Sequence, residues 1–436
     1  MITTDSGQTI EGVDGWKHIT LGDIASEPNC LIQTGPFGSQ LHKHEYQDHG
    51  VGVVNPTHLS DNRIAHEGVP HVSNETANRL ERHRLAPGDI LFARRGEIGR
   101  HGLVSEAENG WLCGTGCFLV RIRRDDVNNH FLSFFLTTRE TVDWLNRHAA
   151  GVVMPNLSNS VLHRVPIALP PLAEQRKIAG VLGLVQRALE QQERLIALTT
   201  ELKKALLHQL FTQGLRGEPQ KQTEIGPVPE SWEVVTLGSL AKVGNGSTPK
   251  RDNKGYWQGG TIAWLNSTKI HERFITQADQ FVTDLAIKEC HLPRVKPGSL
   301  LVAITGQGKT LGNTALISFE TCINQHLAYA QFTTPRVVPE FVLWFMQTRY
   351  DHLRSISQAG GSTKGALTCG YLKTYPVPAL DEQHEIADVF AALDRKEKVH
   401  QCKHAALTAL FRTLLHQLMT AQLRVVDLDL PDLESM

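Results

Sequence analysis

Two kinds of hydrophobic pattern alternate along the chain, and each occurs twice. Short apolar runs beside glycine and proline, such as 89–93 and 299–303, predict β-strands. Each group of such runs is interrupted by a stretch with helical spacing, around 129–147 and again around 339–357. These patterns predict two front domains of the α+β class.

A long stretch without proline follows each front domain. In the first, Leu195, Leu198 and Leu202 fall at steps of three and four residues, which is typical of one face of an amphipathic helix. A helix from 174 to 212 would be about 58 Å long. The second stretch repeats this spacing after Pro378. Because so long a helix with a narrow apolar seam needs a partner, we expect the two helices to pair.

The sequence is an internal duplication with an offset of about 210 residues. The motif Trp16-x-x-x-Thr20-Leu21-Gly22 returns at 232–238, and Leu206-Leu207-His208-Gln209-Leu210 returns unchanged at 414–418. Antiparallel pairing of the two helices would relate the copies by a pseudo-twofold axis and place the front domains at opposite ends, like the jaws of a caliper. The predicted divisions are a first front domain (1–168), a first helix (169–213), a linker (214–231), a second front domain (232–377), a second helix (378–424) and a tail (425–436).

Composition narrows the function classes only modestly. The formal net charge is −1, so any nucleic-acid binding must come from local basic patches. No stretch of about 18 uncharged apolar residues suggests a membrane span, and the polar start of the chain is unlike an export signal. Seven scattered cysteines, an odd number, suit reduced thiols in a cytoplasm, and neither they nor the histidines show metal-site spacing.

One motif suggests nucleotide chemistry. Residues 303–310, Ala-Ile-Thr-Gly-Gln-Gly-Lys-Thr, fit a loose form of the phosphate-binding loop. Such a loop needs a helix after it, whereas 311–319 has the pattern of a turn and a strand. The aligned residues of the first copy, 93–100, lack the Gly-Lys-Thr. We therefore favour a glycine-rich surface loop, and an ATP-dependent enzyme using Lys309 is the weaker alternative.

The starts of the two long helices carry a resemblance to a known family. They read Pro171-Leu172-Ala173-Glu174-Gln175-x-x-Ile178 and Pro378-x-Leu380-x-Glu382-Gln383-x-x-Ile386, and each front domain has a family-like loop, at 34–39 and 245–249. Over nearly its whole length the chain resembles the specificity subunit of type I restriction-modification enzymes.

The resemblance implies a function without catalysis in this chain. Each front domain would be a target recognition domain that reads one half of a split, asymmetric site in double-stranded DNA. The helices would fix the gap and dock two methyltransferase subunits, and restriction and translocase subunits would complete the complex. S-adenosylmethionine and ATP would belong to those partners, and this chain would need no cofactor. The expected docking residues are those of the helix starts: Glu174, Gln175, Ile178, Glu382, Gln383 and Ile386.

Polar and basic loop residues are the candidates for DNA contact, because arginine suits guanine, asparagine and glutamine suit adenine, and lysine suits phosphate. The candidates are Arg94, Arg95, Arg100, Lys250, Arg251, Lys254, Gln307, Lys309, Thr310, Asn313, Ser362, Thr363 and Lys364. Taken singly, each of these loops is more typical of a solvated turn, and the recurrence of the basic turn in both copies favours DNA contact. The alternative from another class is a coiled-coil scaffold whose front domains bind protein or glycan.

Overall fold

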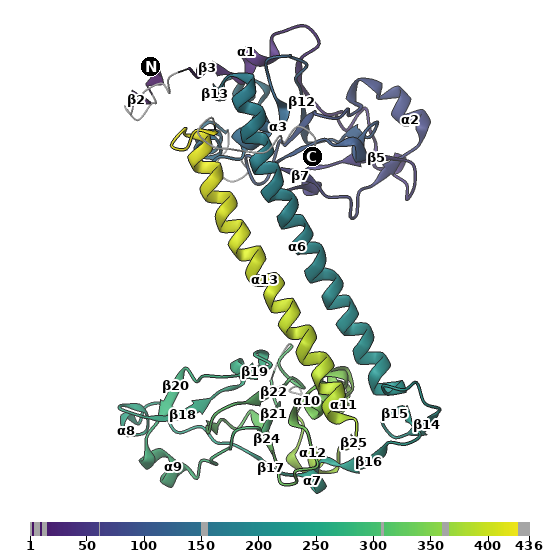
Figure 1. Cartoon of the computed structure of the whole chain (residues 1–436), viewed down its shortest axis with the longest axis vertical. Coiled ribbons are helices and arrows are strands. Elements are labelled where there is room, and N and C mark those ends of the chain that lie inside the picture. Colours follow the sequence, from purple (N-terminus) through teal and green to yellow (C-terminus); the bar gives the residue numbers. More distant parts are fainter. Residues whose placement is uncertain are drawn as a thin grey trace. The chain divides into compact units, whose positions relative to one another are not determined.

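The structure is a computed structural model that describes residues 2–3, 9–10, 15–60, 62–149, 156–306, 309–359 and 366–425. Its internal contacts divide the chain into two units, Met1–Glu193 with Cys402–Met436, and Arg194–Gln401. Each unit holds one front domain, which we call a head, and parts of both long helices (Figure 1). The long helices are α6 (Leu172–Gln213) and α13 (Gln383–Met419), close to the predicted spans.

A four-stranded antiparallel sheet in the order β10-β9-β12-β4 forms the centre of the first head. The strands are β4 (Leu31–Thr34), β9 (Ile90–Ala93), β10 (His101–Leu103) and β12 (Cys117–Arg121). Strand β9 is buried along its whole length because its alternating side chains enter two different cores. Ile90 and Phe92 pack with the helical side of the head, and Leu91 and Ala93 with the opposite side.

Shorter elements surround this sheet. The other strands are β1 (Ile2–Thr3), β2 (Thr9–Ile10), β3 (Lys17–Thr20), β5 (Val51–Val54), β6 (Leu59–Ser60), β7 (Arg63–Ile64), β8 (His71–Val72), β11 (Leu112–Cys113) and β13 (Pro166–Leu169). The helices are α1 (Leu21–Ala25), α2 (Asn74–Arg79), α3 (Asn129–Leu136), α4 (Arg139–His148) and α5 (Asn159–His163).

The second head repeats the sheet with one more strand, in the order β17-β24-β21-β22-β19. Its strands are β14 (Gln220–Thr223), β15 (Gly226–Pro229), β16 (Glu233–Thr236), β17 (Ala241–Asn245), β18 (Ile262–Leu265), β19 (Phe274–Ile275), β20 (Gln280–Val282), β21 (Leu300–Ala303), β22 (Thr314–Ile317), β23 (Cys322–Ile323), β24 (Leu327–Phe332) and β25 (Pro376–Ala379). Its helices are α7 (Leu237–Leu240), α8 (Lys254–Trp257), α9 (Asp284–Cys290), α10 (Pro339–Thr348), α11 (Tyr350–Ala359) and α12 (Cys369–Thr374). The α+β prediction is confirmed for both heads.

The two long helices run antiparallel within each unit. In the second unit Phe211 of α6 stacks on Phe390 of α13, with ring centroids 6.1 Å apart, and Lys203 forms an ion pair with Asp394. In the first unit Glu193 of α6 lies 3.3 Å from His404 of α13. The pairing therefore combines aromatic and charged contacts.

The predicted leucine stripe is buried only in part, since Leu210, which continues it, packs in the core of the second unit. Leu195, Leu198 and Leu202 are 36%, 50% and 50% exposed, while Thr199 and Lys203 are buried. The spacing identified the helix correctly but only part of its buried face, because polar residues that find partners can also be buried there.

Two further predictions need correction. The single helical stretch expected at 129–147 is two helices, because Thr138 leaves the helical conformation and caps α4 through its side chain. The stretch at 339–357 is likewise divided, into α10 and α11. The predicted linker 214–231 contains the hairpin of β14 and β15, which is held by the buried side chains of Ile225 and Val228.

Candidate nucleic-acid interface

Sheet topology brings three loops of the first head to one edge. Strands β4 and β9 both end at this edge, and the antiparallel strand β12 begins there. The Gly35 amide donates to the Cys117 carbonyl (2.8 Å), and the Arg94 amide donates to the Gly116 carbonyl (2.8 Å). We call this end of each central sheet the loop edge. At the loop edge of the second head, the Gly246 amide donates to the Leu327 carbonyl (3.4 Å) and the Ile304 amide donates to the His326 carbonyl (3.0 Å).

A glycine is required at the first loop of each edge. A Cβ atom on Gly35 would lie 2.1 Å from the Gly114 carbonyl oxygen, and one on Gly246 would lie 1.8 Å from the Ile323 carbonyl oxygen. Neither position has room for a side chain. The family-like loops at 34–39 and 245–249 are therefore equivalent turns at the loop edges.

The three predicted arginines of the first head differ in whether their side chains are bound by other residues of the chain. Arg94 Nε donates to Asn156 Oδ1 (3.2 Å), and Arg100 Nη1 donates to the Pro56 carbonyl (3.1 Å). Arg95 is exposed, and among the described residues its side chain has no hydrogen-bond or ion-pair partner. Arg94 and Arg100 thus position the turn, and of the three only Arg95 makes no side-chain hydrogen bond or ion pair within the described part of the chain.

The corresponding turn of the second head contains Lys309, Thr310 and Asn313. Lys309 is exposed, and its carbonyl accepts hydrogen bonds from Asn313 Nδ2 (2.7 Å) and Tyr350 Oη (2.8 Å). Thr310 Oγ1 and Asn313 Nδ2 lie 3.3 and 3.4 Å from the His271 ring nitrogens. The residues from 309 to 317 form a turn and strand β22, as predicted, so no helix N-terminus is available there for a nucleotide phosphate.

Lys250, Arg251 and Lys254 lie in the segment after β17 and are all exposed. In Figure 1 this segment and α8 lie at the end of the second head that is farther from the start of α13. The Arg251 guanidinium rests on the Trp257 ring, 3.9 Å from its centroid. These three exposed cations lie within five residues of one another along the chain.

Four predicted contact residues lie outside the described residues: Gln307, Ser362, Thr363 and Lys364. The first described residue after the last three is Ala366. It forms an antiparallel bridge with Thr305 and so connects this segment to the loop edge. In the first head Asn156 pairs with Arg95 in the same way.

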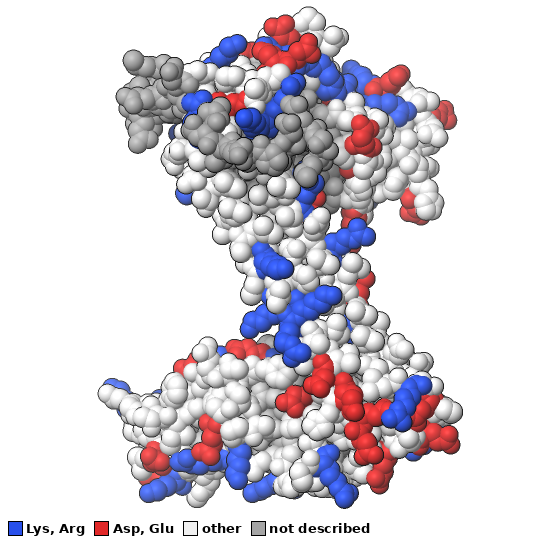
Figure 2. Space-filling model, viewed as in Figure 1, with Lys and Arg blue, Asp and Glu red and all other residues white. Residues whose placement is uncertain are grey.

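Charge is mixed on the surface of both heads. Figure 2 shows basic and acidic side chains on each head, in keeping with the net charge of −1. Any attraction for DNA phosphates must then be local to the loops.

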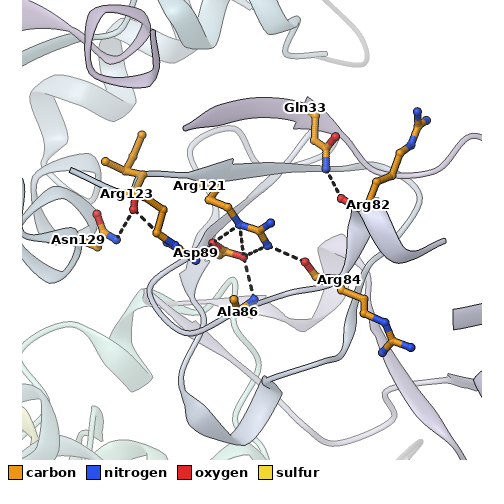
Figure 3. A network of polar contacts seen from close by, with 9 residues as sticks. Gln33, Arg82, Arg84, Ala86, Asp89, Arg121, Arg123 and Asn129 are labelled. Carbon is orange, nitrogen blue, oxygen red and sulfur yellow. Dashed lines mark hydrogen bonds and ion pairs between the residues drawn. The ribbon is translucent and has the colours of Figure 1, made fainter. Parts of the chain in front are cut away.

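A second arginine group was not predicted. Asp89, which is fully buried at the start of β9, accepts hydrogen bonds from Arg121 Nη2 (2.6 Å), Arg123 Nη2 (2.7 Å) and the Ala86 amide (2.9 Å) (Figure 3). Hydrogen bonding to Asp89 raises the pKa of Arg121. This network lies at the opposite end of the sheet from the loop edge, because Asp89 precedes β9 and Arg121 ends β12. It is a structural network, and its only sequence signal is an acid directly after Pro87-Gly88.

The helix-start glutamines form an internal clamp in each unit. Gln175 accepts from the Asn128 amide (2.8 Å) and donates to the carbonyls of Asp126 and Pro170 (3.0 and 2.8 Å). Gln383 makes the same contacts in the second unit, with the Val338 amide (3.0 Å) and the carbonyls of Arg336 and Leu380 (3.1 and 2.9 Å). Each glutamine thus ties the start of a long helix to the capping residue of α3 or α10.

The glutamates beside them bind the end of the other long helix. Arg424, just after α13, forms a bidentate pair with Glu174 (2.7 and 3.0 Å), which also accepts from the Trp16 indole. In the second unit Arg216, just after α6, lies 3.1 Å from Glu382. Each arginine follows its Leu-Leu-His-Gln-Leu motif by six residues. The residue after the long helix of one copy therefore contacts the start of the long helix of the other copy.

These contacts bear on the six helix-start residues that were predicted to dock methyltransferase subunits. Gln175, Ile178 and Ile386 are at most 1% exposed and Gln383 is 4% exposed, while the two glutamates are paired within their units. A buried side chain has no surface to offer a second protein. The structure gives these six residues a role in joining helix and head, and their part in docking a partner stays a prediction.

Sequence reasoning also missed a basic residue that joins each head to its long helix. Arg63 of β7 lies 3.2 Å from Glu193 and 3.5 Å from Glu190. At the equivalent position, Arg273 lies 3.0 Å from Asp394. No local pattern marks these arginines, because their partners are more than 100 residues away.

Metal ligands, thiols and membrane spans were each sought among the described residues. Within them there is no group of three or more histidine, cysteine, aspartate or glutamate side chains placed to hold a metal. Burial raises the pKa of Cys113 and raises that of Cys117 to about 12, which keeps both thiols protonated. In the same part of the chain, no helix combines the length and apolar character that crossing a bilayer requires.

Comparison with known proteins agrees with this architecture. Residues 14–200 and 229–409 each match the type I restriction modification DNA specificity domain. The type I restriction enzyme MjaVIII specificity subunit of Methanocaldococcus jannaschii is 22% identical over 78% of this chain and 80% of its own length. The EcoBI specificity subunit of Escherichia coli is 22% identical over 97% and 91%.

A solved structure has the same fold. The S subunit of a type I restriction-modification system from M. genitalium aligns with a TM-score of 0.59 and 15% identity, over 92% of this chain and 96% of its own. Two domain matches, each spanning a head and most of its long helix, confirm the duplication. The chain belongs to the family of type I restriction-modification DNA specificity subunits.

Proposed function

We propose that this chain is the DNA-reading subunit of a type I restriction-modification complex, and that each head reads one half of a split, asymmetric site in double-stranded DNA. The observation that carries the proposal is that both heads keep the same loop edge while its exposed residues differ. The first edge presents Arg95 and the second presents Lys309, and the segment that follows β17 at the second edge carries Lys250, Arg251 and Lys254. Equivalent frames with different donors suit two different base sequences.

The long helices have two roles in this proposal. Their length fixes the separation of the half-sites, and their exposed faces dock two methyltransferase subunits. Leu202 and Leu410 occupy equivalent positions in the two copies and are 50% and 46% exposed, so each helix offers a similar apolar contact. Methyl transfer with S-adenosylmethionine and ATP-dependent restriction would then belong to partner subunits, in the cytoplasm.

A selection from random duplexes tests the DNA proposal. The full chain, alone and with its methyltransferase partner, should enrich one motif with two constant parts. A seven-residue insertion in α6 and a matching one in α13 should lengthen the unread gap without changing either part. Enrichment of no motif would overturn the proposal and favour a scaffold that binds protein alone. ATP hydrolysis that is lost in Lys309→Ala would favour the nucleotide enzyme instead.

Docking is tested separately. Leu202→Glu and Leu410→Glu should each remove about one of two bound methyltransferase subunits, measured by mass photometry, whereas Glu201→Gln on the same helix should leave the stoichiometry unchanged. Two subunits retained in the double variant would contradict docking through these leucines.

A further inference from the structure

Arg251 of the second head is held by two tryptophans. Its guanidinium carbon lies 3.9 Å from the Trp257 ring centroid and 4.9 Å from that of Trp264. The two indoles meet edge to face, with centroids 5.1 Å apart at 89°. Trp264, on β18, is 2% exposed and so forms a fixed base. The arginine is therefore positioned although it lies on the surface.

The same tryptophans hold the backbone of the loop that carries Arg251. Trp257 Nε1 donates to the Lys250 carbonyl (3.1 Å), and Trp264 Nε1 donates to the Ser247 carbonyl (3.2 Å). Thr248, between them, donates to Gln325 of the neighbouring loop. Because loop and side chain are ordered before any ligand arrives, less conformational entropy is lost on binding.

The guanidinium keeps its hydrogen-bonding edge free. Stacking on an indole uses the flat face of the guanidinium and leaves the N–H groups at its rim. Among the described residues the Arg251 side chain, which is exposed, contacts no hydrogen-bond acceptor or carboxylate. A planar fork of donors in a fixed position matches the O6 and N7 acceptors of guanine in the major groove.

Resting on the proposed function, we propose that Arg251 reads a guanine in the half-site of the second head. Lys250 and Lys254, exposed on either side, contact the flanking phosphates. The register of the parallel strand pairs places Val53 of the first head where Trp264 stands in the second. Because the first head has valine at this position, the contact belongs to only one half of the site.

The test is a selection from a pool of random DNA duplexes by the full chain with its methyltransferase partner. The wild type should show one strongly preferred G·C pair in one half-site. Arg251→Lys, which keeps the charge but not the fork, and Arg251→Gln should lower the preference at that pair about 10-fold or more. All other positions should remain as in the wild type. Trp257→Leu, which frees the guanidinium, should lower the same preference to a smaller extent.

Lys254→Gln is the matched control, three residues away on the same surface. It should weaken binding to all duplexes alike and reduce the salt dependence, without changing the motif. The unchanged half-site of the first head shows that each variant is folded.

Three outcomes separate the claims. An unchanged preference in both Arg251 variants, or a uniform loss over all positions in Arg251→Lys, would overturn the guanine assignment and leave the proposed function standing. No motif with the wild type would instead overturn the proposed function itself.

Discussion

The two heads share a frame but differ in what fills it. Both have the glutamine clamp, the arginine–glutamate contact with the other helix and the loop edge. Where the first head has buried Asp89, the second has Ser299, whose buried hydroxyl has no hydrogen-bond partner among the described residues. Where the second head has Trp264, the first has Val53. The difference teaches that the contacts between head and helix are the same in both copies. The residues that stabilise the loops and those that the loops expose differ between the two heads.

The largest expected effect comes from removing the buried acid. Asp89→Ala should lower the free energy of unfolding of the first head by about 3 kcal/mol, because Arg121 and Arg123 lose their shared partner. The matched change Ser299→Ala should alter the second head by less than about 0.5 kcal/mol, since no hydrogen bond is lost. Pulse proteolysis in urea, with fragments assigned by mass spectrometry, follows each head separately. Equal losses in both heads would contradict the contrast.

The glutamine clamps should respond alike. Gln175→Ala and Gln383→Ala each remove three hydrogen bonds to the backbone and leave a buried amide unpaired. Each substitution should lower the free energy of unfolding of its own unit by about 2 kcal/mol. The same proteolysis assay measures both variants, and a loss confined to one unit would show that the clamp is not a shared feature of the frame.

Acid should destabilise the first head by a smaller amount. Burial lowers the pKa of His83 to about 4 and also lowers that of His101. An unfolded histidine binds a proton below about pH 6.5. The unfolded state therefore binds more protons between pH 6.5 and 4, and stability falls as the pH falls through this range. Midpoints of first-head unfolding at pH 7.5 and 5.5 measure the effect, which His83→Gln should reduce. A midpoint that rises in acid would refute the sign.

The smallest effect is expected from single phosphate contacts. Lys254→Ala should lower the slope of log affinity against log salt by about 1 without changing the motif. Lys242→Ala, on β17 and three residues before the loop, is the control and should leave the slope unchanged. An altered motif in Lys254→Ala would show that this lysine reads a base.

The sequence predicted the repeated elements well because duplication and periodicity are local signals. Helices α6 and α13 and strands β9 and β21 lie where their patterns placed them. The seam of the helix pair was not predictable, because Lys203 can be buried only where Asp394 meets it.

At the candidate site, the sequence predicted the types of residue but not which side chains are bound by other parts of the chain. The motif of the helix starts was recognised, but the sequence did not show that Gln175 and Glu174 bind other parts of their own chain. Arg94 and Arg95 look alike in sequence, and only the position of Asn156 shows that Arg94 is anchored. Contacts between distant segments decide both cases.

Sequencing of methylated DNA from cells that carry this chain with its partner subunits tests the central claim most directly. Two unlike heads predict one asymmetric motif in two parts, separated by a fixed number of unread base pairs, with Arg251→Lys altering one part only. A continuous motif, or two identical halves, would contradict the claim that each head reads its own sequence.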